Sequence, residues 1–442
     1  MRIFGTDGIR GKANYYPMTP ELSLQLGKAL AYVFNETKNG NPPAFVIGKD
    51  TRVSGYLFEN ALTAGLVSMG ADVILVGPMP TPAVAHLTKS FNANAGIVIS
   101  ASHNPAEDNG IKIFSAEGIK LPDEMEIKIE KLLGTEIKPN NGNIGKAYRM
   151  EDARGRYIEF AKSTVNNISL VGMTIVLDCA NGAAYNVAPK IFTELGAHVI
   201  VLNNTPDGYN INNNCGALHP ENVSREVINS KANIGIALDG DADRVILLDE
   251  KGAIVDGDQI LVIAGLHMLQ NKELNSNTIV ATEYSNLALD HAIGKAHGKV
   301  VRVENGDRYV IEEMLKHNYN LGGEQSGHII FFNHTKTGDG TIAALNILKI
   351  MQETGKPLSQ LAKLEKYPQI TKNVEVDQKK PFDQMPEFSK KLEQAKQELS
   401  GKGRLLIRYS GTQNILRIMV EGPQKQIITI VDELVKAAEA SK

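Results

Sequence analysis

The 442-residue chain is poor in cysteine, in net charge and in long apolar runs, and each scarcity excludes a class of protein. Its two cysteines, Cys179 and Cys215, fit no metal-ligand spacing and are typical of a reducing compartment. A net charge of -3 gives no electrostatic reason to expect nucleic acid or a membrane surface as a partner. No apolar run is long enough to cross a bilayer, and no apolar leader precedes Phe4. We therefore expect a cytoplasmic protein with no nucleic-acid or membrane partner.

What the chain does contain is a repeated pattern of strands and helices. Its 42% hydrophobic and 22% charged residues are those of an ordinary globular protein, and its length allows roughly two to four domains. A strand–helix–strand pattern begins at Ala44, again at Ile175 and a third time at Ile279. The phrase Gly-Ala-Asp-Val-Ile at 70–74 returns as Gly-Ala-His-Val-Ile at 196–200. We therefore predict three similar α/β domains with mixed, largely parallel sheets.

The end of the chain has a different pattern. Runs typical of strands occur at 374–376, 404–408 and 415–420, and helical patterns occur at 388–399 and 427–440. These runs indicate a smaller C-terminal α+β domain. Polar stretches near Arg154, Gly257 and Glu365 are the candidate linkers. The predicted domains are therefore 1–154, 155–256, 257–366 and 367–442.

The stretch from Gly96 to Phe114 predicts a buried strand that ends in a polar loop. The apolar run 97–99 is followed by Ser-Ala-Ser-His-Asn-Pro at 100–105, and the proline prevents a return to helix. Ligands of open α/β sheets bind at the carboxyl ends of strands, so Ser102 is our candidate nucleophile. Lys112, which follows an Asp-Asn-Gly turn, is the candidate base. A plain polar turn fits the same letters.

Three aspartates on alternate residues follow the apolar run 234–237. Asp239, Asp241 and Asp243 would repel one another in one turn unless a cation neutralised them, so a hard divalent ion is predicted. An EF-hand calcium loop fails because Arg244 occupies the position that needs glycine. Three protein oxygens leave open positions on magnesium, which suits binding to a phosphate. A plain acidic turn remains the alternative.

Three further clusters contain residues suited to sugars and phosphates. Residues 322–328, Gly-Gly-Glu-Gln-Ser-Gly-His, offer acceptors and donors for sugar hydroxyls beside a flexible backbone. Residues 408–414, with Arg417 after them, combine arginine with Ser, Gly and Thr donors, as a phosphate cradle does. A Gly-rich loop at 4–11 brings Arg10 toward an anion. Gly-rich turns like 322–328 are common without a ligand, and a solvated hairpin turn fits residues 408–414 as well as a phosphate cradle does.

With these motifs in view, the chain resembles the α-D-phosphohexomutase superfamily over essentially its whole length. The motifs FGTDGIRG, ISASHNP, DGDADR, GGEQSGH and RYSGTQN occur in the order of the family. The forms Ser-Ala-Ser-His-Asn-Pro and Gly-Glu-Gln-Ser-Gly-His are similar to the glucosamine branch rather than the phosphomannomutase/phosphoglucomutase branch. The resemblance implies three like domains and a smaller C-terminal domain around a central cleft.

The resemblance also implies a metal site and a modified residue. Ser102 would be phosphorylated in the active enzyme. Asp239, Asp241 and Asp243 would hold one Mg²⁺ per subunit, with the phosphoserine as a further ligand.

Charged groups around the transferring phosphoryl group carry over in the same way. Arg10 and Arg244 would contact that group, and Lys112 and His328 would be acid/base groups. His103, next to the serine, joins them as a candidate catalytic residue.

The residues that would bind the substrate lie in three loops. Those on the sugar side are Gly306, Asp307, Arg308, Glu324 and Ser326. Those for the phosphate that is not transferred are Arg408, Ser410, Gly411, Thr412 and Arg417. Two departures affect details only: Gln413-Asn414 replace the usual Glu-Pro, and Asn305 replaces the usual Val.

The implied activity is transfer of a phosphoryl group within a small sugar phosphate. The phosphoserine would give its phosphoryl group to O1 of glucosamine 6-phosphate, and the bisphosphate formed would return the phosphoryl group from O6. A sugar bisphosphate is then both intermediate and activator. The product would feed UDP-N-acetylglucosamine and peptidoglycan precursor synthesis. A homodimer, and a priming kinase or autophosphorylation at Ser102, stay open.

Other functions also remain open from the sequence. A phosphomannomutase or phosphoglucomutase would use the same scaffold. A phosphomonoester hydrolase with a phosphoserine and a metal would release free phosphate without isomerisation. A non-catalytic sugar-phosphate sensor is disfavoured because a nucleophile, a base and metal ligands are all present.

Overall fold

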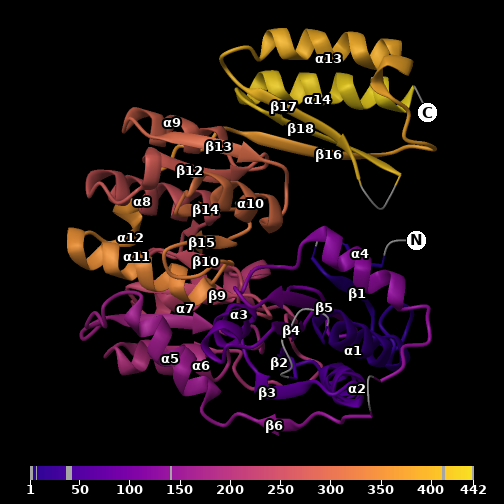
Figure 1. Ribbon diagram of the computed structural model, residues 1–442. Coiled ribbons are helices and arrows are strands. Elements are labelled where there is room, and N and C mark those ends of the chain that lie inside the picture. The colour runs from indigo at the N-terminus through magenta and orange to yellow at the C-terminus, as the bar shows by residue number, and fades with distance from the viewer. Residues whose placement is uncertain (1–2, 6, 36–41, 140–141, 411–413, 441–442) are drawn as a thin grey trace. The chain divides into compact units, whose positions relative to one another are not determined.

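The computed structural model describes residues 3–5, 7–35, 42–139, 142–410 and 414–440. The chain forms two compact units. One consists of Met1–Thr282 with Val301–Lys363, and the other of Glu283–Val300 with Leu364–Lys442. Figure 1 shows the course of the chain from indigo at the N-terminus to yellow at the C-terminus.

The first sheet has six strands in the order β1-β5-β4-β2-β3-β6. Their bounds are β1 Ile9–Lys12, β2 Ala44–Lys49, β3 Asp72–Pro78, β4 Ala95–Ile99, β5 Asp108–Ser115 and β6 Ala147–Arg149. Strands β4, β2, β3 and β6 are mutually parallel, whereas β5 runs antiparallel to β4 and β1 antiparallel to β5. Every residue of β4 is buried, as expected for a strand covered by other elements on both faces.

Helices α1 Pro20–Asn35, α2 Ser54–Ser68, α3 Thr81–Ser90 and α4 Asp123–Leu132 accompany this sheet. Helix α1 begins where the Thr19 hydroxyl accepts a hydrogen bond from the Leu22 N–H at 3.3 Å, and Pro20 suits the first helical position. Its apolar residues at helical spacing form the buried face: Leu26, Ala29, Leu30 and Val33. The helix therefore forms for the reasons that its sequence indicates.

The second sheet has the order β11-β10-β9-β7-β8. Its strands are β7 Thr174–Asp178, β8 His198–Leu202, β9 Ile234–Leu238, β10 Val245–Leu248 and β11 Ile254–Val255. Its helices are α5 Ala153–Ser163, α6 Val187–Glu194, α7 Glu221–Ser230 and the short 3₁₀ helix η1 Gly216–Leu218. Strand β7 is parallel to both β8 and β9, and β10 runs antiparallel to β9.

The third sheet has the order β13-β12-β14-β15. Its strands are β12 Thr278–Thr282, β13 Lys299–Val303, β14 Leu321–Gly323 and β15 Ile329–Phe331. The helical segments in this part of the chain are α8 Gly257–Gln270, η2 Asn275–Asn277, α9 Leu287–Lys295, α10 Asp307–His317, α11 Gly340–Thr354 and α12 Leu358–Leu361. Strand β14 is parallel to β12 and antiparallel to β15.

These three sheets share one arrangement, which confirms the three predicted copies. The strands β5-β4-β2-β3, β10-β9-β7-β8 and β15-β14-β12-β13 correspond in order. In each copy the third strand along the chain is parallel to the first, and the fourth returns antiparallel. The loops 100–107, 239–244 and 324–328 therefore occupy the same place in each copy, at the carboxyl end of its third strand. That end is where open α/β sheets place ligands.

The C-terminal sheet is antiparallel, in the order β16-β18-β17, which confirms an α+β domain. Its elements are β16 Gln369–Glu375, η3 Phe382–Gln384, α13 Pro386–Glu398, β17 Arg404–Tyr409, β18 Ile415–Glu421 and α14 Gln424–Glu439. Strand β16 begins five residues before the predicted run at 374–376. The difference arises because most of β16 is polar or exposed and lies at the sheet edge, where apolar periodicity is weak.

None of the helices in the described ranges is both long enough and apolar enough to span a membrane.

Candidate active site

Ser102 lies buried just after β4 and has a left-handed backbone conformation, with φ of 51°. Its hydroxyl donates a hydrogen bond to Asp239 Oδ2 at 2.7 Å and lies 3.3 Å from His103 Nδ1. The structure thus places Asp239, rather than Lys112, at the hydroxyl of the candidate nucleophile. The third strands of the first two copies bring these two loops together.

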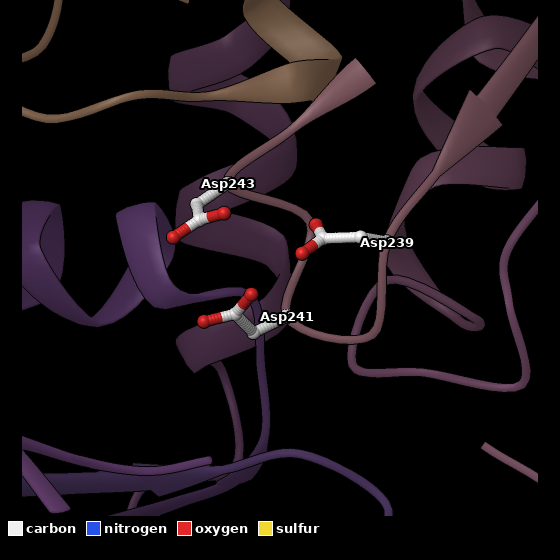
Figure 2. A group of neighbouring side chains, drawn as sticks. All are labelled: Asp239, Asp241 and Asp243. Carbon is white, nitrogen blue, oxygen red and sulfur yellow. The ribbon is translucent and has the colours of Figure 1, made fainter. Parts of the chain in front are cut away.

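The three aspartates form a buried cluster on the turn between β9 and β10. Figure 2 shows their carboxyl groups pointing toward one another. One oxygen from each lies within 4.8 Å of the others, and all three residues are buried. Burial and the charges of the other two aspartates raise the pKa of Asp239 well above its ordinary value. Such crowding disfavours three carboxylates without a counterion.

The oxygens of this cluster fit a divalent cation. Among the described residues, Asp241 Oδ1 and Asp243 Oδ1 are buried and have no hydrogen-bond partner. The other oxygen of Asp241 accepts from the Thr81 hydroxyl at 2.6 Å and from Lys112 Nζ at 2.9 Å. Two hard oxygens without hydrogen bonds beside a third carboxylate suit a calcium- or magnesium-like ion. The cluster could therefore hold a metal ion.

Lys112 lies on β5 and is an ammonium ion in this environment. Its Nζ is 2.9 Å from Asp241, and 3.3 Å from both Asp243 and Asp7. Burial opposes the charged form, but these carboxylates outweigh it and hold the pKa of Lys112 well above its ordinary value. A lysine with a raised pKa donates protons more readily than it accepts them.

Asp7 and Lys120 belong to the same network, although neither was a predicted site residue. Lys120 is partly buried and donates to Asp7 and, at 2.8 Å, to Asp307. Asp7 also pairs with Arg10 and Lys112. Burial raises the pKa of Asp7, but the charges of Lys112, Lys120 and Arg10 together hold it well below the ordinary value. Asp7 was present in the FGTDGIRG motif, whereas nothing in the sequence singled out Lys120.

His328 lies just before β15 in the third copy, close to two carboxylates of this network. Its Nδ1 lies 3.8 Å from Asp243, and its Nε2 lies 3.8 Å from Asp307. Burial opposes protonation, but the nearby carboxylate of Asp243 raises the pKa of His328 to about 9. The Gly338 N–H acts in the other direction, because its hydrogen bond of 3.0 Å requires a bare Nε2. This hydrogen bond places the ring proton on Nδ1, the nitrogen that faces Asp243.

Two arginines and a neutral histidine complete the surroundings of Ser102. Arg10 Nε and Arg244 Nε are both buried donors without a hydrogen-bond partner among the described residues. Burial lowers the pKa of His103 to about 4, with Arg244 and Arg10 adding to the effect. Unmatched guanidinium donors next to an uncharged imidazole leave the site ready for an anion.

The predicted sugar-side residues come together between β14, β15 and the start of α10. Glu324 accepts from the Gly306 N–H at 3.2 Å and from the Ser326 hydroxyl at 3.4 Å. The Arg308 guanidinium is paired with Asp123 at 2.6 Å and with Glu312 at 2.9 Å. Glu324 and Ser326 are therefore adjacent, whereas the side chain of Arg308 is held by carboxylates.

The C-terminal unit contains its own cluster of arginines. Arg408 and Arg417 are directly opposite each other on β17 and β18. Arg408 Nε donates to the Tyr284 hydroxyl at 3.0 Å, while Arg417 Nε is buried without a partner in the described part of the chain. Like charges facing each other across strands are destabilising unless an anion lies between them. Ser410 is buried beside them, and Gly411 and Thr412 lie outside the described residues.

Comparison with known proteins identifies the class. Models of the phosphoglucomutase/phosphomannomutase family match domain I at residues 1–139, domain II at 155–252, domain III at 256–367 and the C-terminal domain at 372–437. The chain belongs to this family of isomerases, and the resemblance drawn from its five motifs is confirmed.

The chain is also similar over nearly its whole length to curated phosphoglucosamine mutases. A phosphoglucosamine mutase of Geobacter sp. (strain M21) is 55% identical over 95% of this chain and 94% of its own. Those of Geobacter metallireducens and Myxococcus xanthus are 55% and 53% identical, over 97% and 95% of this chain and 96% and 93% of theirs. Among solved structures, a phosphoglucomutase/phosphomannomutase family protein of Burkholderia thailandensis has a TM-score of 0.83 at 22% identity, covering 100% of this chain and 97% of that one.

Proposed function

We propose that the chain interconverts glucosamine 6-phosphate and glucosamine 1-phosphate through a phosphoserine at Ser102. The observation that carries the proposal is the 2.7 Å hydrogen bond from the Ser102 hydroxyl to Asp239, a member of the buried aspartate cluster. Full-length relatives at 52–55% identity support the choice of glucosamine over other hexoses. A serine next to a cation site is what phosphoryl transfer requires.

We assign the metal ion to Mg²⁺, held by Asp239, Asp241 and Asp243. When bound, it would neutralise charge on the equatorial oxygens of the transferring phosphoryl group. Ca²⁺ could bind the same oxygens, but it holds its ligands at longer distances and in a more variable geometry.

The charged side chains around Ser102 align the phosphoryl group and move protons. Arg10 and Arg244 offer their unmatched N–H groups to its oxygens. Lys112, an ammonium ion held by Asp241 and Asp243, is the acid that we assign to Ser102 Oγ when that oxygen leaves. His328 is the corresponding group on the sugar side, oriented by the Gly338 N–H. Alignment and charge compensation supply most of the catalysis of such reactions.

The remaining residues hold the sugar while its two ends exchange places. Glu324 accepts from ring hydroxyls, and Ser326 supports it. Arg408, Ser410 and Arg417 bind whichever phosphate is not being transferred. The intermediate is a sugar bisphosphate, and the same compound can prime Ser102.

The test of this assignment is relative turnover on the 6-phosphates of glucosamine, mannose and glucose, with free phosphate measured in parallel. We expect isomerisation of glucosamine 6-phosphate to have the highest kcat/KM and phosphate release to be slight. A preference for mannose or glucose 6-phosphate would make the chain a phosphomannomutase or phosphoglucomutase. Release of phosphate without isomerisation would make it a hydrolase. The intact mass of the purified protein before and after phosphatase treatment reports phosphorylation.

Replacing Arg417 by alanine should lower kcat/KM about ten- to a hundredfold, because an arginine–phosphate contact is worth about 1.5–3 kcal/mol. The loss should appear as a higher KM and as escape of bisphosphate. Thermal stability should change little, since the variant also removes the repulsion with Arg408.

The matched control is Lys372→Ala on the neighbouring strand. Asn373 is the residue opposite Arg417, so Lys372 points to the other face of the same sheet, where it is exposed. This variant should keep full activity. If Arg417→Ala were as active as Lys372→Ala, the C-terminal loop would be a structural turn rather than a phosphate site.

A further inference from the structure

The loop that carries Ser102 is built around one buried guanidinium group. Arg52 follows β2, the strand next to β4, and its side chain has 0% exposure to solvent. One terminal nitrogen donates to the carbonyl oxygens of Ser102 at 3.1 Å and Asn104 at 2.8 Å. The other donates to the carbonyl oxygens of Pro105 and, at 3.0 Å, Asp108. Four carbonyls of a single loop thus converge on one side chain.

A second contact path reaches Ser102 from its other side. Arg52 Nε donates to Asp50 Oδ2 at 2.8 Å, and the Ser100 hydroxyl donates to the same oxygen at 2.6 Å. The Ser100 oxygen in turn accepts from the Ser102 N–H at 2.9 Å. Both the N–H and the carbonyl of Ser102 are therefore tied to the Arg52–Asp50 pair.

This anchoring matters because Ser102 has the left-handed conformation that residues other than glycine avoid. A non-glycine residue keeps such a conformation only where its surroundings determine it several times over. The Asn212 side chain adds two more donors, to the carbonyls of Ser102 at 2.8 Å and Asn104 at 3.0 Å. Without these donors the inward-pointing carbonyls would be buried and unpaired.

We propose that Arg52, held by Asp50, is a positioning residue that keeps Ser102 in the conformation from which its hydroxyl reaches Asp239. The inference rests on the proposed role of Ser102 in phosphoryl transfer. Arginine is required because a planar fork can donate to several carbonyls at once, whereas a lysine ammonium is a compact point charge. Arg52 acts through the loop and has no assigned contact with the substrate.

The decisive comparison is Arg52→Met against Lys49→Met. Lys49 is the last residue of β2, is 1% exposed, and is paired with Glu59 on α2. Both variants remove a buried cation a few residues apart and leave a buried carboxylate, so both should lower thermal stability. Only Arg52→Met should lower kcat, by about a hundredfold, with KM changed less than about threefold. Phosphorylation of Ser102 by added sugar bisphosphate, followed by intact mass, should slow in the same proportion.

Arg52→Lys keeps the charge and covers the case in which Arg52→Met does not fold. It should fold and still lose most of kcat, and hydrogen exchange in residues 100–109 should accelerate in it but not in Lys49→Met. Wild-type kcat in Arg52→Lys with unchanged exchange in that segment would overturn the inference. Equal losses of kcat in Arg52→Met and Lys49→Met would overturn it too, because the effect would then be general destabilisation.

If the wild type neither isomerised sugar phosphates nor became phosphorylated, the proposed function would fall. Faster exchange in Arg52→Lys would then still establish the anchoring of the loop.

Discussion

Ser102→Ala should abolish isomerisation, reducing kcat by more than about a hundredfold and in practice below detection. Removal of a covalent nucleophile usually costs far more than this, because no other group can take over the bond. The Ser102 hydroxyl donates a hydrogen bond to Asp239. Alanine would therefore keep the aspartate cluster but remove the oxygen that accepts the phosphoryl group. The measurements are turnover of glucosamine 6-phosphate and incorporation of phosphate from sugar bisphosphate, followed by intact mass.

Ser115→Ala is the control for this variant. Ser115 ends β5, the strand that returns from the Ser102 loop, and its backbone pairs with Ala95 at the far end of β4. Both variants should fold, because the loss of one hydroxyl removes little packing, and thermal unfolding would check this. Turnover by Ser102→Ala above about one hundredth of the wild-type value would exclude the covalent route.

The parts of the site that could be predicted from sequence are those in which neighbouring residues act together. Ser102 follows a short apolar run, and the three aspartates alternate along one turn. Each motif therefore indicates its own location at the end of a strand, and the shared topology of the three sheets brings these ends into equivalent positions. The strand and helix patterns also depend on neighbouring residues, so their repetition is sufficient to predict the fold class.

The contacts between motifs could not be predicted, because they depend on pairing between residues far apart in the chain. Lys112 follows the serine loop closely, which made it the candidate base, yet β5 directs it to Asp241 and Asp243. Lys120 could not be singled out because its partners, Asp7 and Asp307, lie far apart in the chain. Arg308 matched a sugar-side loop by sequence, but in the structure carboxylates of α4 and α10 hold it.

The role of Arg52 also could not be predicted from the sequence. Its neighbours, Asp50-Thr51, read as an ordinary strand end, and no spacing relates it to the serine loop fifty residues later. Only the parallel pairing of β2 with β4 brings the two segments side by side. The role of such a buried side chain follows only from the hydrogen bonds that the loop makes in the folded protein.

Chelation of divalent metal should stop turnover completely, and Mg²⁺ should restore it. The reason is the geometry of the aspartate cluster, in which Asp241 and Asp243 each present a buried oxygen without a hydrogen-bond partner among the described residues. Without a cation the phosphoryl oxygens would face three carboxylates, which repel them. Ca²⁺ should bind but support little turnover, since its looser coordination aligns the phosphoryl group less well. Full activity in excess EDTA would contradict the metal assignment.

Binding can be measured apart from activity, as a rise in thermal stability with Mg²⁺ concentration. Saturation at about a hundred times Kd should stabilise the fold by about 2.7 kcal/mol. Asp241→Asn should lose most of this rise, whereas Asp152→Asn, which alters only an exposed pair with Arg156, should keep it. An equal rise in both variants would place the ion elsewhere.

The stabilisation of the fold by Mg²⁺ should also depend on pH, and the raised pKa of Asp239 determines whether it grows or fades as pH rises. Burial and the neighbouring aspartates raise the pKa of Asp239 above its unfolded value, so the folded protein without metal retains that proton to higher pH than the unfolded chain does. The stability gained from this protonation is lost as pH rises through the raised pKa. Mg²⁺ must displace the same proton, so its stabilising effect should grow as pH rises and fade as pH falls. Thermal shifts measured from pH 5 to 8 at fixed Mg²⁺ would test this, and a shift that grew toward acid pH would rule out Asp239 as a ligand.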